Sequence, residues 1–292
     1  MAAVQLGGSL RFHPERISSS GPTSRGTWRV GKWDTVFMQL EICVDSVESA
    51  IAAERGGAQR VELCSDLLEG GITPSAGLVA LVRSSIGIGL FVMIRPRGGD
   101  FSYTDCEFAV MQEDIRSARE LGADGVILGL LDEHARIDVP RTQRLVELAG
   151  PLPVTFHRAI DMTPDPQAAL EDVVKTGAKR VLTSGGCAKV KEGLAVVASM
   201  VEAAGSRIIV MPGGGITAHN IVNIAEATGA CEFHASLRTA QPSPVEYRRP
   251  GMQMGEIRDR EYLRFAVEEQ NVCALALALR RMVEERAASR PQ

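Results

Sequence analysis

A short motif, Gly-Ala followed two residues later by a strand-like segment, occurs four times along the chain. The copies begin at Gly57, Gly122, Gly177 and Gly229. Glycine commonly ends a helix, so each copy predicts a helix end followed, at a fixed offset, by a strand. Strands that recur in one sense with helices between them pair in parallel through crossover connections. The motif therefore indicates a repeating α/β architecture.

Strand-like segments occur at eight places, and helix-like segments lie between most of them. They are Leu40–Cys43, Val61–Cys64, Leu90–Ile94, Gly125–Leu128, Val154–His157, Val181–Ser184, Ile208–Met211 and Glu232–Ala235. The Gly-Ala copies precede the second, fourth, sixth and eighth of these strands. Eight strand-helix units predict an α/β protein with a single (β/α)8 TIM-type barrel. A doubly wound open sheet is the alternative, but no Gly-rich dinucleotide turn follows the first strand.

Residues that favour helix N-termini precede several of the expected helices. Asp45 with Glu48, and Thr104 with Glu107, have the spacing of a capping box. Thr73 and Thr163 each precede a proline, which is favoured at the first helical position. We therefore expect helices to begin directly after these four cap residues.

Residues 1–37 differ in composition from the rest of the chain. They are rich in Ser and Gly, and their charged residues are mostly basic: Arg11, Arg16, Arg25, Arg29 and Lys32 against Glu15 and Asp34. We interpret them as a disordered basic N-terminal extension, followed by a barrel domain at 38–288. No apolar core of a secretory signal is present, but an Arg- and Ser-rich segment is typical of transit peptides. Organelle targeting by residues 1–37 therefore stays open.

The chain beyond the eighth strand is expected to change character twice. Residues 237–260 contain several prolines and read as a long irregular stretch, which would cover the barrel mouth or reach a neighbouring subunit. Leu263, Phe265 and Val267 then alternate with other residues. An amphipathic C-terminal helix at about 272–286 follows, and we consider it a candidate surface for a homo-oligomer.

Composition limits the partners that the protein can have. The formal net charge is -4 and aromatic residues make up 4% of the chain, so we expect no nucleic-acid partner and no attraction to anionic lipid. No apolar run approaches the ~20 residues of a membrane span, so no membrane partner is expected. The six cysteines lack paired spacing, which favours a reducing compartment over a disulfide framework.

Alternation along the strands predicts which side chains enter the barrel lumen. Apolar residues such as Leu40 and Ile42 suit the helix-facing side, which leaves their neighbours inside. The inferred lumen holds six polar residues: Glu41, Glu62, Arg95, His157, Glu232 and His234. Barrel interiors are ordinarily filled by branched apolar residues, so this set favours a ligand site. A purely structural ion-pair network is the alternative.

Two of the lumen residues are also candidates for acid-base or ligand chemistry. His157 follows the fifth strand and is a candidate general acid or base. Glu62 is a second candidate for proton transfer, with Glu41 or Arg95 tuning its pKa. A hydrogen-bonded structural histidine is the alternative reading of His157.

Glycine-rich turns after several strands predict an anion site. Consecutive glycines at Gly213, Gly214 and Gly215 precede a helix, and such turns present N–H groups to phosphate. Ser184 and Gly185 after the sixth strand and Arg238 after the eighth are candidates to complete it; Arg95 and Arg97 suit a carboxylate or phosphate after the third strand. A tight turn without ligand, and a surface loop held by an Arg–Asp pair, are the alternatives.

Cys43 and Cys64 end the first two strands, each after a glutamate and an apolar residue. Neighbouring strands lie ~4.8 Å apart, so level strand ends would bring the thiols together. Thiolates select soft ions such as Cu(I), and Met93 on the next strand adds a thioether. Buried cysteines that act as small apolar residues are the alternative.

Six segments in the same order resemble one known family. They are EICVDSVESA, GGAQRVELCSDLLEGGITPS, IRPRGGDFSY, LPVTFHRAIDM, RVLTSGG and VMPGGGIT, beginning at Glu41. They are similar to segments of the CutC copper-homeostasis family. The resemblance implies a (β/α)8 barrel, a mainly cytosolic location with a nuclear one also open, and Cys43 and Cys64 as Cu(I) ligands.

Two functions follow from these observations. The first is copper homeostasis, with Cu(I) bound by the strand-end cysteines for intracellular trafficking or tolerance. The alternative is a TIM-barrel enzyme that acts on a small anionic or phosphorylated metabolite, because copper storage does not require so polar a lumen.

Overall fold

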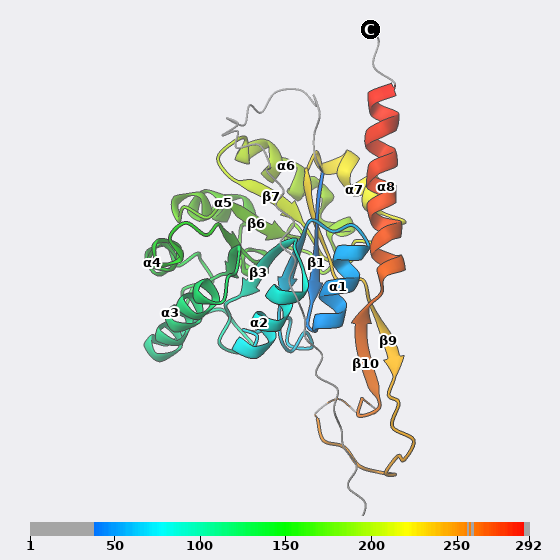
Figure 1. The fold of residues 1–292 in the computed structure, drawn as a ribbon. Coiled ribbons are helices and arrows are strands. Elements are labelled where there is room, and N and C mark those ends of the chain that lie inside the picture. The colour runs from blue at the N-terminus through cyan, green and yellow to red at the C-terminus, as the bar shows by residue number, and fades with distance from the viewer. Residues whose placement is uncertain (1–37, 256, 258–259, 289–292) are drawn as a thin grey trace, which may run out of the picture.

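The structure is a computed structural model that describes residues 38–255, 257 and 260–288. The expected N-terminal extension at residues 1–37 lies outside this part of the chain. The described chain forms a barrel of parallel strands surrounded by helices, with a hairpin and a long helix at one side (Figure 1).

Eight parallel strands form the barrel wall, as the sequence predicted. They are β1 (Gln39–Val44), β2 (Arg60–Leu63), β3 (Gly89–Met93), β4 (Gly125–Leu128), β5 (Val154–Phe156), β6 (Arg180–Thr183), β7 (Ile209–Pro212) and β8 (Glu232–Ala235). Their order is β7-β6-β5-β4-β3-β2-β1-β8. A single parallel bridge between Gly213 and His234 joins β7 to β8 at the seam. The barrel is therefore nearly closed.

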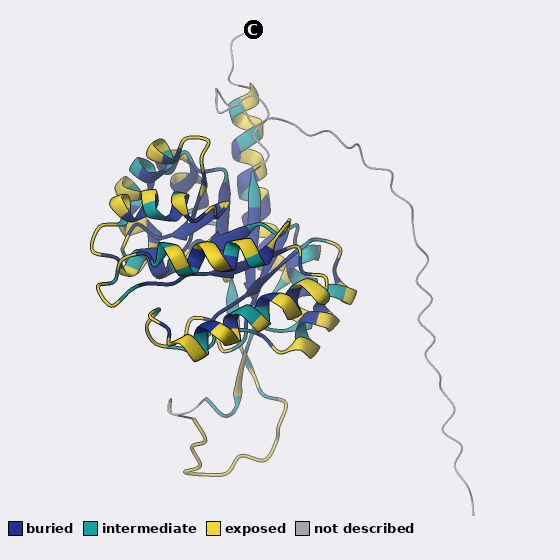
Figure 2. Ribbon diagram, turned by 90° about the vertical axis from the view of Figure 1, so that its left-hand side faces the viewer, coloured by how far each residue is buried: buried dark blue, intermediate teal, exposed yellow. Residues whose placement is uncertain are grey.

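Helices follow the strands and cover the outside of the barrel. They are α1 (Val47–Arg55), α2 (Ala76–Ser85), α3 (Asp105–Glu120), α4 (Val139–Ala149), α5 (Pro166–Lys175), α6 (Leu194–Ala204) and α7 (Ile221–Thr228), with short 3-10 helices η1 (Arg158–Met162) and η2 (Val190–Glu192). Their inner faces are buried and their outer faces exposed (Figure 2). Outward strand residues such as Ile42 and Leu63 are fully buried against them. Burial of this apolar layer drives the fold.

Three of the four expected helix caps are wrong. The capping box of Thr104 and Glu107 is confirmed at the start of α3. Helix α1, however, is capped by Ser46, because Asp45 pairs instead with Arg238 at 2.8 Å. Asp45 therefore makes a tertiary contact in place of the expected cap.

The second displaced cap lies before α2. Ser75 caps this helix by accepting the N–H of Leu78. The hydroxyl of Thr73 accepts the backbone N–H of Arg95 instead, at 3.0 Å. This bond ties the approach to α2 to the end of β3. The third displaced cap lies before α5, which is capped by Asp165, whereas the hydroxyl of Thr163 donates to the Ile160 carbonyl at 2.7 Å.

The chain after β8 departs from the expected irregular stretch. Its first residues form β9 (Arg238–Pro242), which pairs antiparallel with β10 (Leu263–Val267), the segment in which alternation was noted. Strand β10 of this hairpin packs against α1 on the outside of the barrel (Figure 1). The C-terminal helix α8 (Glu269–Ala288) is longer than predicted and packs against α1 and α7.

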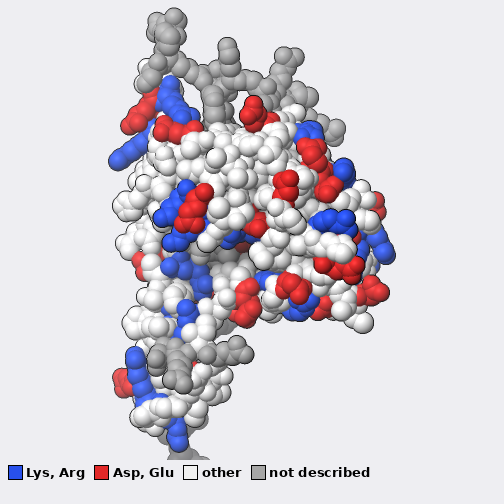
Figure 3. Space-filling view, turned by 180° about the vertical axis from the view of Figure 1, so that it is seen from behind, with Lys and Arg blue, Asp and Glu red and all other residues white. Residues whose placement is uncertain are grey.

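Acidic and basic side chains are interspersed over the barrel face seen in Figure 3. Within the described ranges, no helix has the length and apolar character that a bilayer crossing requires.

Candidate functional site

The lower layer of the lumen, at the amino-terminal ends of the strands, is an ion-pair network. Arg60 donates to Glu41 Oε2 and, at 2.8 Å, to Glu232 Oε2. Arg180 donates to the same Glu232 oxygen at 2.6 Å. The Cζ atoms of both guanidinium groups lie 4.9 and 5.6 Å from the centroid of the Phe91 ring. Two buried cations thus share Glu232, and this part of the lumen is structural.

Arg60 and Arg180 are lumen residues that sequence reasoning missed. The expected strands began one residue late, at Val61 and Val181, so alternation was not extended backward. A signal was present, since both arginines occupy the fourth position of a Gly-Ala motif copy. Strand side chains two positions apart face the same side of a sheet. A charged residue two positions before an inward-facing residue therefore also points into the lumen.

His234 connects this network to the next layer of the lumen, toward the carboxyl ends of the strands. Its Nδ1 lies 2.8 Å from Glu41 Oε1, and its Nε2 lies 3.5 Å from Glu62 Oε2. Burial acts to lower the pKa of His234, but the charges of Glu62 and Glu41 raise it well above the usual value. Burial likewise opposes ionisation of Glu41, yet Arg60 and His234 hold its pKa well below the ordinary range. The imidazole is therefore a cation between two carboxyl groups.

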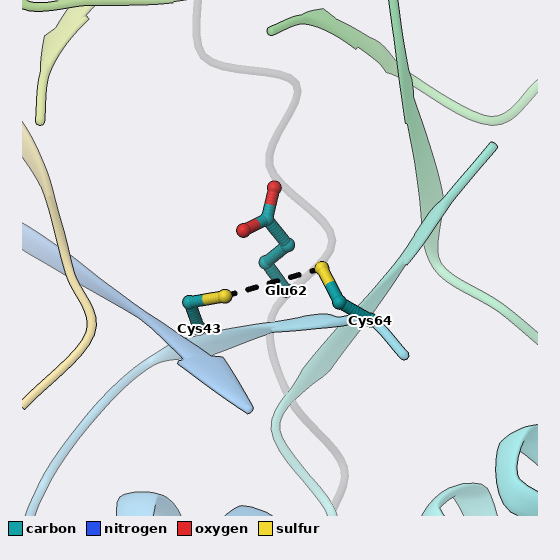
Figure 4. A group of neighbouring side chains, drawn as sticks. All are labelled: Cys43, Glu62 and Cys64. Carbon is teal, nitrogen blue, oxygen red and sulfur yellow. Dashed lines mark hydrogen bonds between the residues drawn. The ribbon is translucent and has the colours of Figure 1, made fainter. Parts of the chain in front are cut away.

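Cys43 and Cys64 point toward each other, with Glu62 beside them, as Figure 4 shows. Their Sγ atoms are 3.9 Å apart, and both residues are buried. They are not level across the sheet, because Cys43 pairs in register with Glu62, and Cys64 follows the end of β2. The stagger of barrel strands still brings the two side chains together. Phe91, Met93 and Ile127 pack with them, and Leu67 borders the cluster.

Both thiols are protonated at neutral pH. Their mutual hydrogen bond and burial raise the pKa of Cys43 well above the usual value. For Cys64 that hydrogen bond acts in the opposite direction, but burial and the charge of Glu62 raise the pKa to about 11. Burial also raises the pKa of Glu62. A metal ion that binds here must therefore displace protons from sulfur.

The donor set fits a soft metal ion. Ligand atoms of Cys43, Glu62 and Cys64 lie within 4.8 Å of one another, and Glu62 Oε1 is buried without a hydrogen-bond partner among the residues that the structure describes. Metal–sulfur bonds of ~2.3 Å allow two sulfurs on one ion to lie up to about 4.6 Å apart. The observed separation of 3.9 Å fits a bent arrangement. A second group, Glu41, Glu62 and His234, is also close, but Arg60 already neutralises Glu41.

Arg95 and His157 lie at the carboxyl ends of β3 and β5. Arg95 donates to the carbonyl oxygens of Glu69, Gly71 and Gly99 at 2.6, 3.0 and 2.7 Å. Burial, together with the charge of Arg95, lowers the pKa of His157 to about 3. His157 is therefore neutral, unlike His234.

The candidate anion loop after β6 is occupied by a carboxylate of the protein itself. Asp161 Oδ1 accepts the N–H of Ser184 at 3.1 Å and of Gly186 at 3.0 Å. The Gly185 N–H donates to Thr183 Oγ1 instead. Asp161 lies in the segment LPVTFHRAIDM, and sequence reasoning gave it no role.

The remaining anion candidates are dispersed. In the turn after β7, Gly213 donates its N–H to the Thr183 carbonyl, and Gly214 and Gly215 have positive φ angles of 103° and 79°. Arg97 pairs with Glu107 and Asp100. Arg238 pairs with Asp45 at the start of the hairpin. These residues are not brought to one point, and anion binding by them stays a prediction.

The fold and site define a (β/α)8-barrel protein with a buried thiol pair beside a charged lumen. The model of the CutC family matches residues 38–239. A copper homeostasis protein cutC homolog of Mus musculus is 54% identical over 216 residues, which are 74% of this chain and 79% of that protein. A family protein CutC of Chromobacterium violaceum is 50% identical over 240 residues, 82% of this chain and 97% of that one. The chain belongs to the CutC family.

Solved structures agree on the fold. CutC from Streptococcus agalactiae superposes with a TM-score of 0.65 at 35% identity, over 68% of this chain and 98% of that one. The N-(5'-phosphoribosyl)anthranilate isomerase of Pyrococcus furiosus gives a TM-score of 0.51 at 13% identity, over 84% and 98%. The second likeness shows the barrel fold alone.

Proposed function

We propose that this protein acts in copper homeostasis by binding Cu(I) through the thiolates of Cys43 and Cys64. The observation that carries the proposal is the 3.9 Å separation of two buried sulfurs at the carboxyl ends of neighbouring strands. Relatives at about half identity are named copper homeostasis proteins, which supports copper as the ion. Copper is the cargo in this proposal, for intracellular trafficking or tolerance.

The surroundings favour Cu(I) over harder cations. Thiolate sulfur prefers soft ions, and the apolar side chains of Phe91, Met93 and Ile127 line the other side of the pair. Glu62 adds a single carboxylate to the two sulfurs. The site would therefore exclude Mg²⁺ and Ca²⁺, which require several oxygen ligands.

The proposal is tested by anaerobic Cu(I) titration against a competing chelator. The double variant Cys43→Ser, Cys64→Ser is expected to lose high-affinity binding of Cu(I). The matched control is Cys106→Ser, Cys273→Ser, which removes two exposed thiols and should leave the affinity unchanged. Equal affinity of the first double variant and the wild type would show that copper binds elsewhere.

The thiol pair also requires a reducing compartment, so we propose a cytoplasmic location. Oxidation to a disulfide would remove both ligands, and reduced thiols persist in the cytosol. Fluorescence microscopy of the full chain and of a variant that starts at Met38 would test this. A change of location on truncation would assign targeting to residues 1–37.

A further inference from the structure

Among the described residues, three arginine side chains are buried within the barrel, and they differ in their partners. Arg60 and Arg180 pair with glutamates in the lower layer. Arg95 is 4% exposed, yet it forms no salt bridge with any carboxylate in the described part of the chain. Its Nη atoms donate to three backbone carbonyls, and its Nε has no hydrogen-bond partner there.

A buried charge without a counter-ion is costly, and backbone carbonyls compensate it only in part. The Arg95 side chain is held in position by hydrogen bonds to the carbonyls of Glu69, Gly71 and Gly99, which lie in the loops that follow β2 and β3. The guanidinium is thus held rigidly while its charge is left unpaired. This arrangement is expected when a bound anion supplies the missing charge.

His157 presents a second unpaired donor. Its Nδ1 accepts the backbone N–H of Ala159 at 3.2 Å, so Nδ1 carries no hydrogen. Because the ring is neutral, the hydrogen resides on Nε2. Nε2 is buried and has no partner in the described part of the chain. The structure therefore fixes a neutral N–H donor with no acceptor.

Both donors lie against one aromatic ring. The centroid of Phe101 is 4.9 Å from Arg95 Cζ and 4.9 Å from the centroid of the His157 ring. Phe101 is partly exposed, so movement of this side chain would uncover both donors. Gly129 makes room for the imidazole, since a Cβ there would lie 2.5 Å from the His157 ring.

We propose that the carboxyl-end mouth of the barrel binds a small molecule bearing an oxyanion, a carboxylate or a phosphate, with Arg95 as counter-ion and the His157 Nε2–H as neutral donor. Guanidinium groups suit both oxyanions, and a neutral imidazole N–H adds a donor that cannot lose its proton near pH 7. This site is separate from the copper proposal, because neither residue is a thiol ligand. The Ser184 loop is a weaker candidate, since Asp161 already occupies it.

The test uses the copper-free full chain labelled with ¹⁵N-histidine, titrated separately with malonate and with inorganic phosphate. We expect one of the probes to shift the His157 Nε2–H resonance saturably, and which one does so separates carboxylate from phosphate. Exposed His134 and His219 report general ionic effects in the same spectra. His157→Phe assigns the resonance. If neither probe shifts it selectively, the proposal is wrong.

Calorimetry on variants provides the second measurement. His157→Phe removes a hydrogen-bond donor to a charged group, so we expect it to raise the Kd of the probe that binds by at least about tenfold. Arg136→Met is the matched control, because Arg136 is exposed and pairs with Asp132, and it should leave the Kd unchanged. Equal weakening by both variants would overturn the assignment.

Two further variants complete the design. Arg95→Lys keeps the charge but removes the fork of donors, so we expect weaker probe binding in a protein that still gives a dispersed spectrum. Cys43→Ser, Cys64→Ser should bind the probe as the wild type does, even though copper binding is lost. Loss of probe binding in that double variant would assign the anion to the metal site and overturn the proposal.

Discussion

Asp161 accepts the backbone N–H of Ser184, and so the turn that looked ready for an external anion is filled by an internal one. The side chain of Asp161 is only 5% exposed, and it also accepts the hydroxyl of Thr183 at 2.6 Å. Sequence patterns identify N–H groups that are free to bind an anion, but they do not reveal a carboxylate that arrives from another strand end.

Removal of this carboxylate should create the anion site that it now occupies. Asp161→Ala leaves several buried donors unpaired and is expected to lower the free energy of unfolding by about 2 kcal/mol or more. Formate should restore part of the loss, because it supplies the missing carboxylate. Thermal unfolding with and without formate checks this. Asp100→Ala removes an exposed carboxylate and should show no formate effect.

The shared glutamate of the lower layer is expected to dominate barrel stability. Glu232→Gln leaves Arg180 without a counter-charge and Arg60 with Glu41 alone, which should cost about 3–5 kcal/mol in urea unfolding. Glu171→Gln breaks an exposed pair with Arg207 and should change stability little. Comparable losses from both variants would contradict the assigned role of Glu232.

Stability should decline as the pH rises above about 6.5, the ordinary histidine pKa. The pKa of His234 is raised in the folded protein by Glu62 and Glu41, despite burial. Its contribution is therefore complete below its unfolded pKa and is lost as pH rises toward the folded one. Urea unfolding at pH 6 and pH 9 measures the slope. His234→Gln should flatten it, whereas His219→Gln, which alters an exposed residue, should not.

Copper affinity should fall with falling pH. Both thiols have raised pKa values and must lose protons on binding, so each copper displaces about two protons near neutrality. The apparent affinity is then expected to fall roughly a hundredfold per pH unit. Competition titrations at two pH values measure this slope, and a flat profile would argue against thiolate ligation.

Gly129 should tolerate no side chain. A Cβ would lie 2.5 Å from His157, so Gly129→Ala is expected to lose about 1–3 kcal/mol through overpacking and to displace the ring. Gly77→Ala, where no heavy atom lies within 4 Å of the added Cβ, should be neutral or stabilising. Urea unfolding of both variants checks the contrast.

The sequence predicted the barrel well because the evidence for it is local and repeated. Each Gly-Ala copy marks a helix end and a strand start, and all eight expected strands overlap observed ones. Helix caps were less predictable. Asp45 and Thr73 are good caps in isolation, but Arg238 and Arg95 compete for them from distant parts of the chain.

The candidate site was predictable where alternation alone decided it. Glu41, Glu62 and His234 point inward as expected and interact with one another. The pairing of Arg95 with carbonyls, and the neutrality of His157, depend on burial and on the exact approach of loops. Such properties arise from the assembled barrel, and no pattern along one strand encodes them.

The Arg60–Glu232–Arg180 cluster, with the Phe91 ring beside both guanidinium groups, closes one end of the barrel lumen. Its base is sealed by charges that cannot separate without a large cost. Whatever enters must leave by the same rim. Binding and release of copper would therefore both take place at the carboxyl-end rim of the barrel, and a partner that docks there would block both.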